Sequence, residues 1–155
     1  MATKVLMVCL GNICRSPMAQ GILEQKVAEH DLDVEVDSAG TSDYHIGQEP
    51  DHRAIAKCKE YGIDISNYRG RQLVKEDFKN FDRIFVMDSS NYNNSVSLTN
   101  DSEELSKVQM MLNVSQPGSN MSVPDPYFGG EEGFENVYRL LDSACDVLIN
   151  ELKGE

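Results

Sequence analysis

The segment from Cys9 to Ser16 constrains the fold of this chain more than any other feature, because it joins a buried strand to a helix through a short polar loop. Val5 to Val8 form a continuous apolar run, which is typical of a central strand covered on both faces. Ser16 and Pro17 are residue types preferred as a helix N-cap and as a first helical residue. We therefore predict a strand that ends at the loop and a helix that begins at Ser16 and Pro17.

The composition of this loop suits a phosphate ligand. A tight loop that leads into a helix directs backbone N–H groups at an anion, and the helix dipole favours negative charge at the same place. Gly11 and Asn12 tolerate the positive φ that such a loop requires. The residues predicted to bind phosphate are Leu10, Gly11, Asn12, Ile13, Cys14 and Arg15.

Cys9 and Arg15 carry the predicted chemistry. A helix amino terminus and a nearby cation lower the pKa of a cysteine thiol from about 8.5 to between about 3.5 and 7.5, and the thiolate is the form that attacks phosphorus. An arginine side chain is planar, stays charged and can hold two phosphate oxygens at once. The loop therefore predicts a cysteine-dependent phosphatase in which Cys9 is the nucleophile and Arg15 binds the phosphate.

The rest of the chain alternates between expected strands and helices. Apolar patterns predict a strand at 34–37, a helix at 51–61, a strand at 83–87 and a long closing helix from Phe134 to Leu152. Residues 108–114 fit a fourth strand, with a helix as the open alternative. This alternation predicts an α/β fold of three layers, α/β/α, with a central, mostly parallel four-stranded sheet of the flavodoxin-like or Rossmann-like kind, in a single domain over residues 1–155. Ligands of such sheets bind beyond the carboxyl ends of the strands, where the Cys9 loop is expected.

Charge and cysteine content narrow the possible partners. A formal net charge of −12 argues against nucleic acid or an anionic membrane as a partner. The apolar run near the start is far shorter than the roughly 20 residues that span a bilayer, and cysteines without a secretion signal suggest reduced thiols, so we expect a cytoplasmic protein.

Cys58 and Cys145 fall on apolar helix faces, where core packing is expected. No nucleotide-binding glycine motif occurs and His30, His45 and His52 lack metal-ligand spacing, so neither a cofactor nor a metal is expected.

Motifs along nearly the whole chain resemble those of the low-molecular-weight protein tyrosine phosphatases, whose loop reads Cys-x5-Arg-Ser. Beyond the loop, the matching segments are Asp37-Ser38-Ala39-Gly40-Thr41, Pro50-Asp51 with Arg53-Ala54, Arg71-Gln72, Met87-Asp88 and Asp125-Pro126-Tyr127. The resemblance implies a hydrolase that acts on phosphotyrosine and small aryl phosphates, with tyrosine-phosphorylated proteins as substrates and inorganic phosphate as product. It also implies a monomer or a weak dimer.

The resemblance assigns roles that the residues alone do not. In the family, the aspartate of Asp-Pro-Tyr protonates the leaving group and later activates water, and here this role falls on Asp125; such a group contributes about 10²- to 10⁴-fold to the rate. Aromatic residues form the walls of the family's pocket, and Tyr44, Tyr127 and Phe128 occupy the matching positions. Tyr44 stands where many members carry a tryptophan and Phe128 where many carry a second tyrosine, so the preferred substrate is less fixed than the reaction.

A second group of residues is expected to support the loop from behind. In the family, a serine and often a histidine hold the loop asparagine in place. Ser38 matches the serine, Ser16 is expected to act beside it, and Tyr68 occupies the histidine position, where its hydroxyl either replaces the histidine or leaves the loop less rigid. Cys14 is either a packing residue or the partner of a reversible disulfide that protects Cys9 from irreversible oxidation.

Three other functions are weighed against this interpretation. Arsenate reductases share the loop and fold but need a further cysteine pair, and no cysteine lies between Cys58 and Cys145. A phosphocarrier subunit of a sugar transport system also has a cysteine after its first strand, but it does not require Arg15 or Asp125. A phosphatase-like binding module that has lost catalysis is disfavoured because Cys9, Arg15 and Asp125 are all present.

Overall fold

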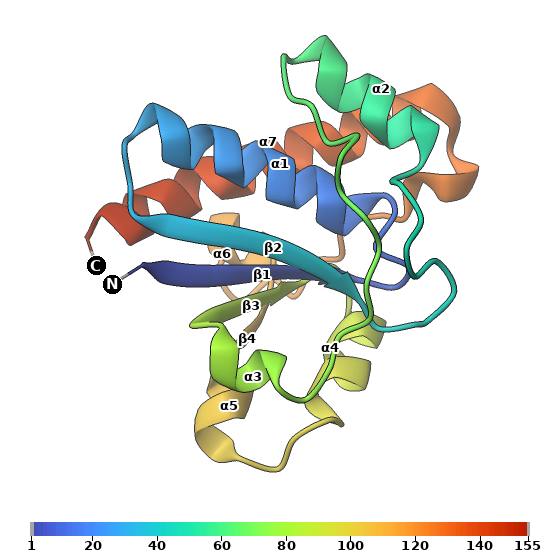
Figure 1. The fold of residues 1–155 in the computed structure, drawn as a ribbon. Helices are drawn as coiled ribbons and strands as arrows, with labels where there is room; N and C mark the ends of the chain where they lie inside the picture. Colours follow the sequence, from blue (N-terminus) through green and yellow to red (C-terminus); the bar gives the residue numbers. More distant parts are fainter. Residues whose placement is uncertain (1, 155) are drawn as a thin grey trace.

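The computed structural model describes residues 2–154, apart from the side chain of Phe128. At its centre is a sheet of four parallel strands in the order β2-β1-β3-β4 (Figure 1). The strands are β1 (Thr3–Cys9), β2 (Val34–Gly40), β3 (Arg83–Val86) and β4 (Val108–Met110). The predicted α/β/α fold with a mostly parallel four-stranded sheet is confirmed. Because β2 and β3 lie on opposite sides of β1, the strand order reverses at the carboxyl end of β1, the usual place for a ligand site.

Helices cover both faces of the sheet (Figure 1). One face carries α1 (Arg15–Glu29), α2 (His52–Glu60), α6 (Leu112–Ser115) and α7 (Gly130–Lys153). The opposite face carries α3 (Asp77–Asn80), α4 (Ser89–Val96) and α5 (Ser102–Ser106). A single turn of 3-10 helix, η1 (Pro126–Phe128), precedes α7. The sequence predicts α1, α2 and α7, whereas α3, α4 and α5 are too short to show a clear apolar stripe.

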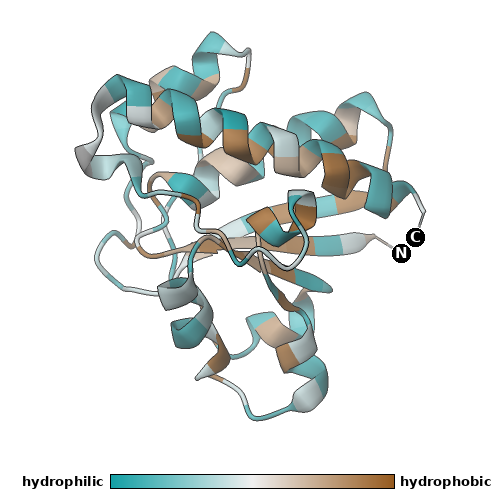
Figure 2. Cartoon of the chain, turned by 180° about the vertical axis from the view of Figure 1, so that it is seen from behind, coloured by the Kyte–Doolittle hydropathy of each residue, from teal (hydrophilic) through white to brown (hydrophobic). Residues whose placement is uncertain are grey.

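The apolar run of β1 supplies side chains to two separate cores. Val5 and Met7 pack against α1 and α7, whereas Leu6 and Val8 pack on the other face with Phe78 of α3. Successive strand residues point to opposite faces, so a strand covered on both sides must be apolar throughout. Figure 2 shows hydrophobic residues concentrated on the strands and hydrophilic residues on the outer faces of the helices. Among the helices of residues 2–154, none is both long and apolar enough to cross a membrane.

Two element boundaries next to the loop differ from the prediction. Helix α1 begins at Arg15 with Cys14 as its N-cap, two residues before the predicted N-cap Ser16, and no side chain caps it. Strand β2 continues to Gly40, beyond the predicted end at Asp37. The extension follows from pairing, because β2 remains in register with β1 until Gly40 lies opposite Cys9. Contacts across a sheet thus outweigh the weak strand preference of small residues.

Two further expectations are corrected in part. Residues 108–114 contain both of the alternatives, since β4 occupies Val108–Met110 and α6 begins at Leu112. Tyr61, expected on the buried face of α2, is 42% exposed and stacks on Tyr138 with ring centroids 3.8 Å apart. A tyrosine at a helix end can cover an apolar neighbour while its hydroxyl stays in contact with solvent.

Candidate active site

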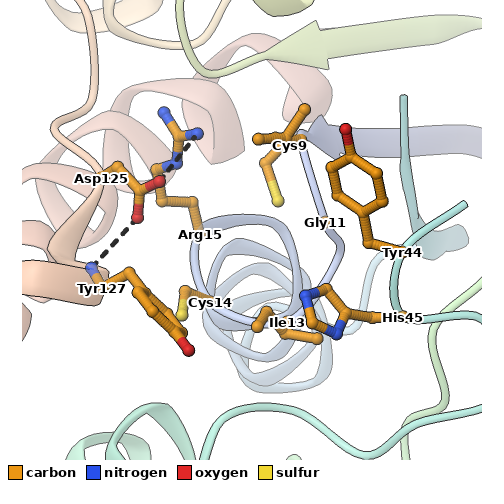
Figure 3. A pocket seen from close by; sticks show the side chains of 10 residues that line it. Cys9, Gly11, Ile13, Cys14, Arg15, Tyr44, His45, Asp125 and Tyr127 are labelled. Atoms are coloured by element: carbon orange, nitrogen blue, oxygen red, sulfur yellow. Dashed lines mark hydrogen bonds and ion pairs between the residues drawn. The ribbon is translucent and has the colours of Figure 1, made fainter. Parts of the chain in front are cut away.

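A pocket opens at the carboxyl end of β1. Figure 3 shows the side chains of Cys9, Arg15 and Asp125 turned toward it, with Tyr44 and Tyr127 on opposite sides. The lining residues are Cys9, Leu10, Gly11, Ile13, Cys14, Arg15, Tyr44, His45, Asp125 and Tyr127. Of these, only His45 is not a predicted site residue. Segments far apart in the sequence therefore meet at one place, as the resemblance implies.

The backbone of the loop presents unused donors to this pocket. Within residues 2–154, the N–H groups of residues 11–14 donate no hydrogen bond to another group. They lie at the amino terminus of α1, which no side chain caps. Free N–H groups together with the positive end of a helix dipole form a site for an anion.

Asn12 fixes the shape of the loop from its buried side. Its φ of 59° lies in the left-handed region, as predicted. Its side-chain amide donates to the hydroxyls of Ser16 at 2.8 Å and Ser38 at 3.0 Å. Its Oδ1 accepts from the backbone N–H of Arg71 at 3.1 Å, and Ser38 donates in turn to Gln20 at 2.7 Å. The loop is thereby tied to α1, to β2 and to the segment that precedes α3.

Glycines allow other segments to approach the loop closely. Asn12 supplies the positive φ of the loop, whereas Gly11, which the sequence predicts to tolerate one, does not adopt it. Instead, a Cβ atom at Gly11 would lie 2.9 Å from Cδ2 of His45. At the end of β2, a Cβ atom at Gly40 would lie 2.7 Å from the carbonyl oxygen of Leu10. A side chain at Gly40 would displace the loop backbone itself.

Cys9 is 3% exposed, and its Sγ lies 3.1 Å from the hydroxyl oxygen of Ser16. The Ser16 hydroxyl also reaches the carbonyl oxygen of Ala39 at 3.5 Å. The Ser16 hydroxyl therefore contacts the Cys9 sulfur instead of capping α1, which explains why the predicted N-cap is wrong. A hydroxyl that donates to a sulfur favours its thiolate form.

The buried Arg15 side chain is held by a fixed acidic partner. Its Nη1 donates to Oδ2 of Asp88 at 2.8 Å and to the carbonyl oxygen of Val123 at 2.9 Å. Asp88 follows β3 and is itself held as the N-cap of α4, where it accepts from Asn91. Arg15 Nη2 lies 4.0 Å from Oδ2 of Asp125. The guanidinium thus has a fixed orientation, in which Nε and Nη2 donate no hydrogen bond to another described group.

The residues at the rim of the pocket are more exposed. Tyr44 is 70% exposed, Tyr127 is 43% exposed and the Asp125 side chain is 47% exposed. Asp125 is the N-cap of η1, where its Oδ1 accepts from the backbone N–H of Tyr127 at 3.1 Å. This hydrogen bond orients the carboxyl group beside Arg15. The side chain of Phe128, the third predicted wall, lies outside the described part of the chain.

Tyr68 does not contact the loop asparagine in the way that a replacement for the family histidine would. Its hydroxyl donates to Glu24 of α1. Burial raises the pKa of the Glu24 carboxyl, even though Tyr68 donates to it. Gln20 instead accepts from Ser38, which supports Asn12. The sequence holds one signal for this role, since Gln20 lies one helical turn after Ser16 on the same face of α1.

The other cysteines are buried. Burial, followed by the nearby Asp51 carboxylate, raises the pKa of the Cys14 thiol well above its ordinary value, and this side chain lines the pocket. Burial raises the pKa of Cys58 and of Cys145 to about 12, which fits their expected packing role. Within residues 2–154, no group of three or more histidine, cysteine or acidic side chains is placed to hold a metal ion.

Known proteins match this chain over nearly its full length. The family model of the low molecular weight phosphotyrosine protein phosphatases matches residues 4–155. The human low molecular weight phosphotyrosine protein phosphatase is 38% identical over 151 residues, covering 96% of this chain and 95% of that protein. A protein tyrosine phosphatase from Entamoeba histolytica superposes with a TM-score of 0.92 at 39% identity, covering 99% of this chain and 98% of that one. The Drosophila arginine phosphatase superposes with a TM-score of 0.87 at 36% identity, covering 97% and 98% of the two chains.

Proposed function

Because this chain belongs to the low molecular weight phosphotyrosine protein phosphatase family, we propose that Cys9, Arg15 and Asp125 together hydrolyse phosphotyrosine in proteins and small aryl phosphates. One observation carries the assignment: a buried thiol, a buried guanidinium and a half-exposed carboxyl group line one pocket that is ringed by unused backbone N–H groups. These are the parts that phosphoryl transfer to a thiolate needs.

In the first step, the Cys9 thiolate attacks phosphorus. An S–P bond forms while the P–O bond to the tyrosine ring breaks, and the Asp125 carboxyl group gives its proton to the departing phenoxide. Arg15 holds two nonbridging oxygens through Nε and Nη2, since Nη1 already bonds to Asp88 and Val123. The loop N–H groups stabilise the charge on the phosphoryl oxygens.

In the second step, the Asp125 carboxylate takes a proton from water while the water oxygen attacks phosphorus. The S–P bond breaks, inorganic phosphate leaves and the Cys9 thiolate is restored. No cofactor enters either step. Ser16, 3.1 Å from the Cys9 sulfur, supports the thiolate as nucleophile and as leaving group.

The test is hydrolysis of two aryl phosphates, one with a poor and one with an activated leaving group, in a buffer without added metal. Cys9→Ser should abolish both reactions. Asp125→Ala should lower the rate of phenol release in the first turnover by about 10²- to 10⁴-fold for the poor leaving group and much less for the activated one, because only the poor leaving group needs the proton. Equal losses on both substrates would contradict the acid role.

The substrate is tested with phosphopeptides of one sequence. Tyr44 and Tyr127 stand on opposite sides of the pocket, where a flat ring would pack between them (Figure 3). We expect kcat/KM for the phosphotyrosine peptide to exceed that for the phosphoserine and phosphoarginine peptides. The phosphoarginine peptide is included because one structural relative is an arginine phosphatase. A higher kcat/KM for that peptide would overturn the tyrosine assignment.

Three finer assignments belong to the same proposal. The protein acts in the cytoplasm, and it acts as a monomer or a weak dimer. Cys14, which lines the same pocket as Cys9, protects it: peroxide converts the Cys9 thiolate to a sulfenic acid, the Cys14 thiol displaces its hydroxyl as water, and a disulfide forms. Thiol treatment should then restore the peroxide-treated protein but not its Cys14→Ser variant. Equal recovery of both would contradict this role.

A further inference from the structure

Arg53 is anchored to the phosphate loop through Asp51. The backbone N–H of Asp51 donates to the carbonyl oxygen of Ile13 in the loop at 2.8 Å. The Asp51 carboxylate accepts from the backbone N–H of Arg53 at 2.8 Å, and from its Nε and Nη2 at 3.0 Å each. Two parallel hydrogen bonds fix the plane of a guanidinium as well as its position. The Arg53 side chain thus has a defined orientation relative to the loop.

The charge on this pair is stable at neutral pH. Burial alone raises the pKa of the Asp51 carboxyl, but the hydrogen bonds from Arg53 outweigh it and leave the pKa below its ordinary value. Arg53 is therefore a permanent cation beside a permanent anion at the edge of the pocket.

The same guanidinium lies against two aromatic rings that follow Asp125 in the chain. Its central carbon lies 5.2 Å from the ring centroid of Tyr127 and 4.9 Å from that of Phe134, a buried residue of α7. An arginine within about 6 Å of a ring centroid is attracted to the ring face, by about 0.5 to 1 kcal/mol at an exposed site. Arg53 thus links the loop to η1 and to the start of α7.

Tyr127 in turn holds the carboxyl group of Asp125, the proposed general acid. Its backbone N–H donates to Oδ1 of Asp125 at 3.1 Å, and the nearest cation, Arg15, is 4.0 Å from Oδ2. The half-exposed Asp125 side chain therefore depends on η1 for its place. We propose that Arg53 is a positioning residue, which holds Tyr127 and through it keeps the Asp125 carboxyl group over the phosphate loop. This inference rests on the proposed acid role of Asp125.

Lysine cannot fill this position. An ammonium group is a point charge, so it cannot make the two parallel bonds to Asp51 while its flat face meets Tyr127. Arg53→Lys should therefore behave like Arg53→Met, although it keeps the charge. Because the Arg53 side chain is 43% exposed, both variants should unfold close to the wild-type temperature.

The experiment compares Arg53→Met and Arg53→Lys with a control, Arg139→Met. Arg139 is an exposed cation of α7 that pairs with Glu135 and lies outside the pocket. For an aryl phosphate with a poor leaving group, both Arg53 variants should lower the rate of phenol release in the first turnover by about 10-fold, because small misplacements of a catalytic group are costly. For an activated leaving group the loss should be about 2-fold or less, and the control should change neither rate.

A second comparison separates this inference from the proposed function. In an Asp125→Ala background, Arg53→Met should lower kcat no further, since the group it positions is absent. Equal losses by Arg53→Met on the two substrates, a raised KM with unchanged kcat, or an undiminished effect in Asp125→Ala would each overturn the inference alone. If Asp125→Ala itself shows no dependence on the leaving group, the acid role and this inference fail together.

Discussion

The phosphate loop and the rim of the pocket are held in place by different means. In the loop, Asn12 is buried and makes three hydrogen bonds to α1, β2 and the segment before α3. At the rim, Tyr44 is 70% exposed and Tyr127 is 43% exposed. The proposed nucleophile and phosphate-binding groups thus belong to the folded core, whereas the proposed acid, Asp125, and the aromatic walls of the pocket stand on its surface. We therefore expect changes at the rim to alter substrate preference with little loss of stability, and changes at Asn12, the buried anchor of the loop, to destabilise the protein.

The largest effect that tests this contrast is expected for Asn12→Ala. The change removes the hydrogen bonds that the buried Ser16 and Ser38 hydroxyls accept from Asn12, leaves the backbone N–H of Arg71 without its acceptor, and places alanine at a φ of 59°. A buried group without a partner costs about 1 to 3 kcal/mol, and a left-handed alanine about 1 to 2 kcal/mol more. The free energy of unfolding in denaturant should fall by about 3 kcal/mol, and kcat should fall by at least about 10-fold.

The matched control is Asn94→Ala, at an exposed position of α4 that is not one of the pocket residues. Its free energy of unfolding should stay within about 0.5 kcal/mol of the wild type. An Asn12→Ala protein with wild-type stability and kcat would show that the loop does not depend on its buried anchor.

A smaller effect, confined to binding, is expected for Tyr44→Ala. Loss of one aromatic wall should weaken ring packing by about 0.5 to 1.5 kcal/mol, which raises KM for a phosphotyrosine peptide by roughly 2- to 12-fold. Inhibition by inorganic phosphate and the free energy of unfolding should not change, because the ring is exposed and outside the loop. The control is Tyr61→Ala, an exposed tyrosine stacked on Tyr138 of α7, for which KM should not change. A large loss of stability in Tyr44→Ala would show that the exposed rim, like the buried loop, contributes to the stability of the fold.

The smallest effect is expected at the two helix cysteines. Burial raises the pKa of Cys58 and of Cys145 to about 12, so their thiolates form only as the pH approaches that value. At neutral pH, iodoacetamide should modify Cys9 and leave these two thiols free, as read from peptide masses. In denaturant, all four cysteines should react. Modification of Cys58 or Cys145 in the native protein at the rate of Cys9 would show that burial does not protect them.

The sequence predicts the loop well because its elements are local. A continuous apolar run, a cysteine, an arginine and a helix start lie within 14 residues of one another, from Val5 to Met18. The partners of Arg15 could not be predicted in this way, because Asp88 and Val123 are 73 and 108 positions away in the chain. Asp88 is part of a motif shared with the family, but no local pattern connects it to a guanidinium.

The N-cap of α1 was predicted wrongly, and the packing role of Gly11 was not predicted, for a related reason. Ser16 has the chemistry of an N-cap, yet its hydroxyl lies beside the Cys9 sulfur, because the loop brings them together. Gly11 is explained by the approach of His45, a residue from another segment that shows no motif of its own. Local preference sets which residues are possible at a position, and tertiary contacts decide how they are used.

The central claim is that the phosphoryl group is transferred to the Cys9 sulfur before water removes it. The most direct test is to trap this phosphocysteine intermediate. Asp125→Ala protein is mixed with an activated aryl phosphate and quenched in acid within one turnover, and its peptides are analysed by mass. Because this variant forms the S–P bond but lacks the base that directs water at it, phosphate should accumulate on the peptide that contains Cys9. Cys9→Ser, treated in the same way, should carry none. Turnover with no phosphate on Cys9, or phosphate bound to a different residue, would contradict the account.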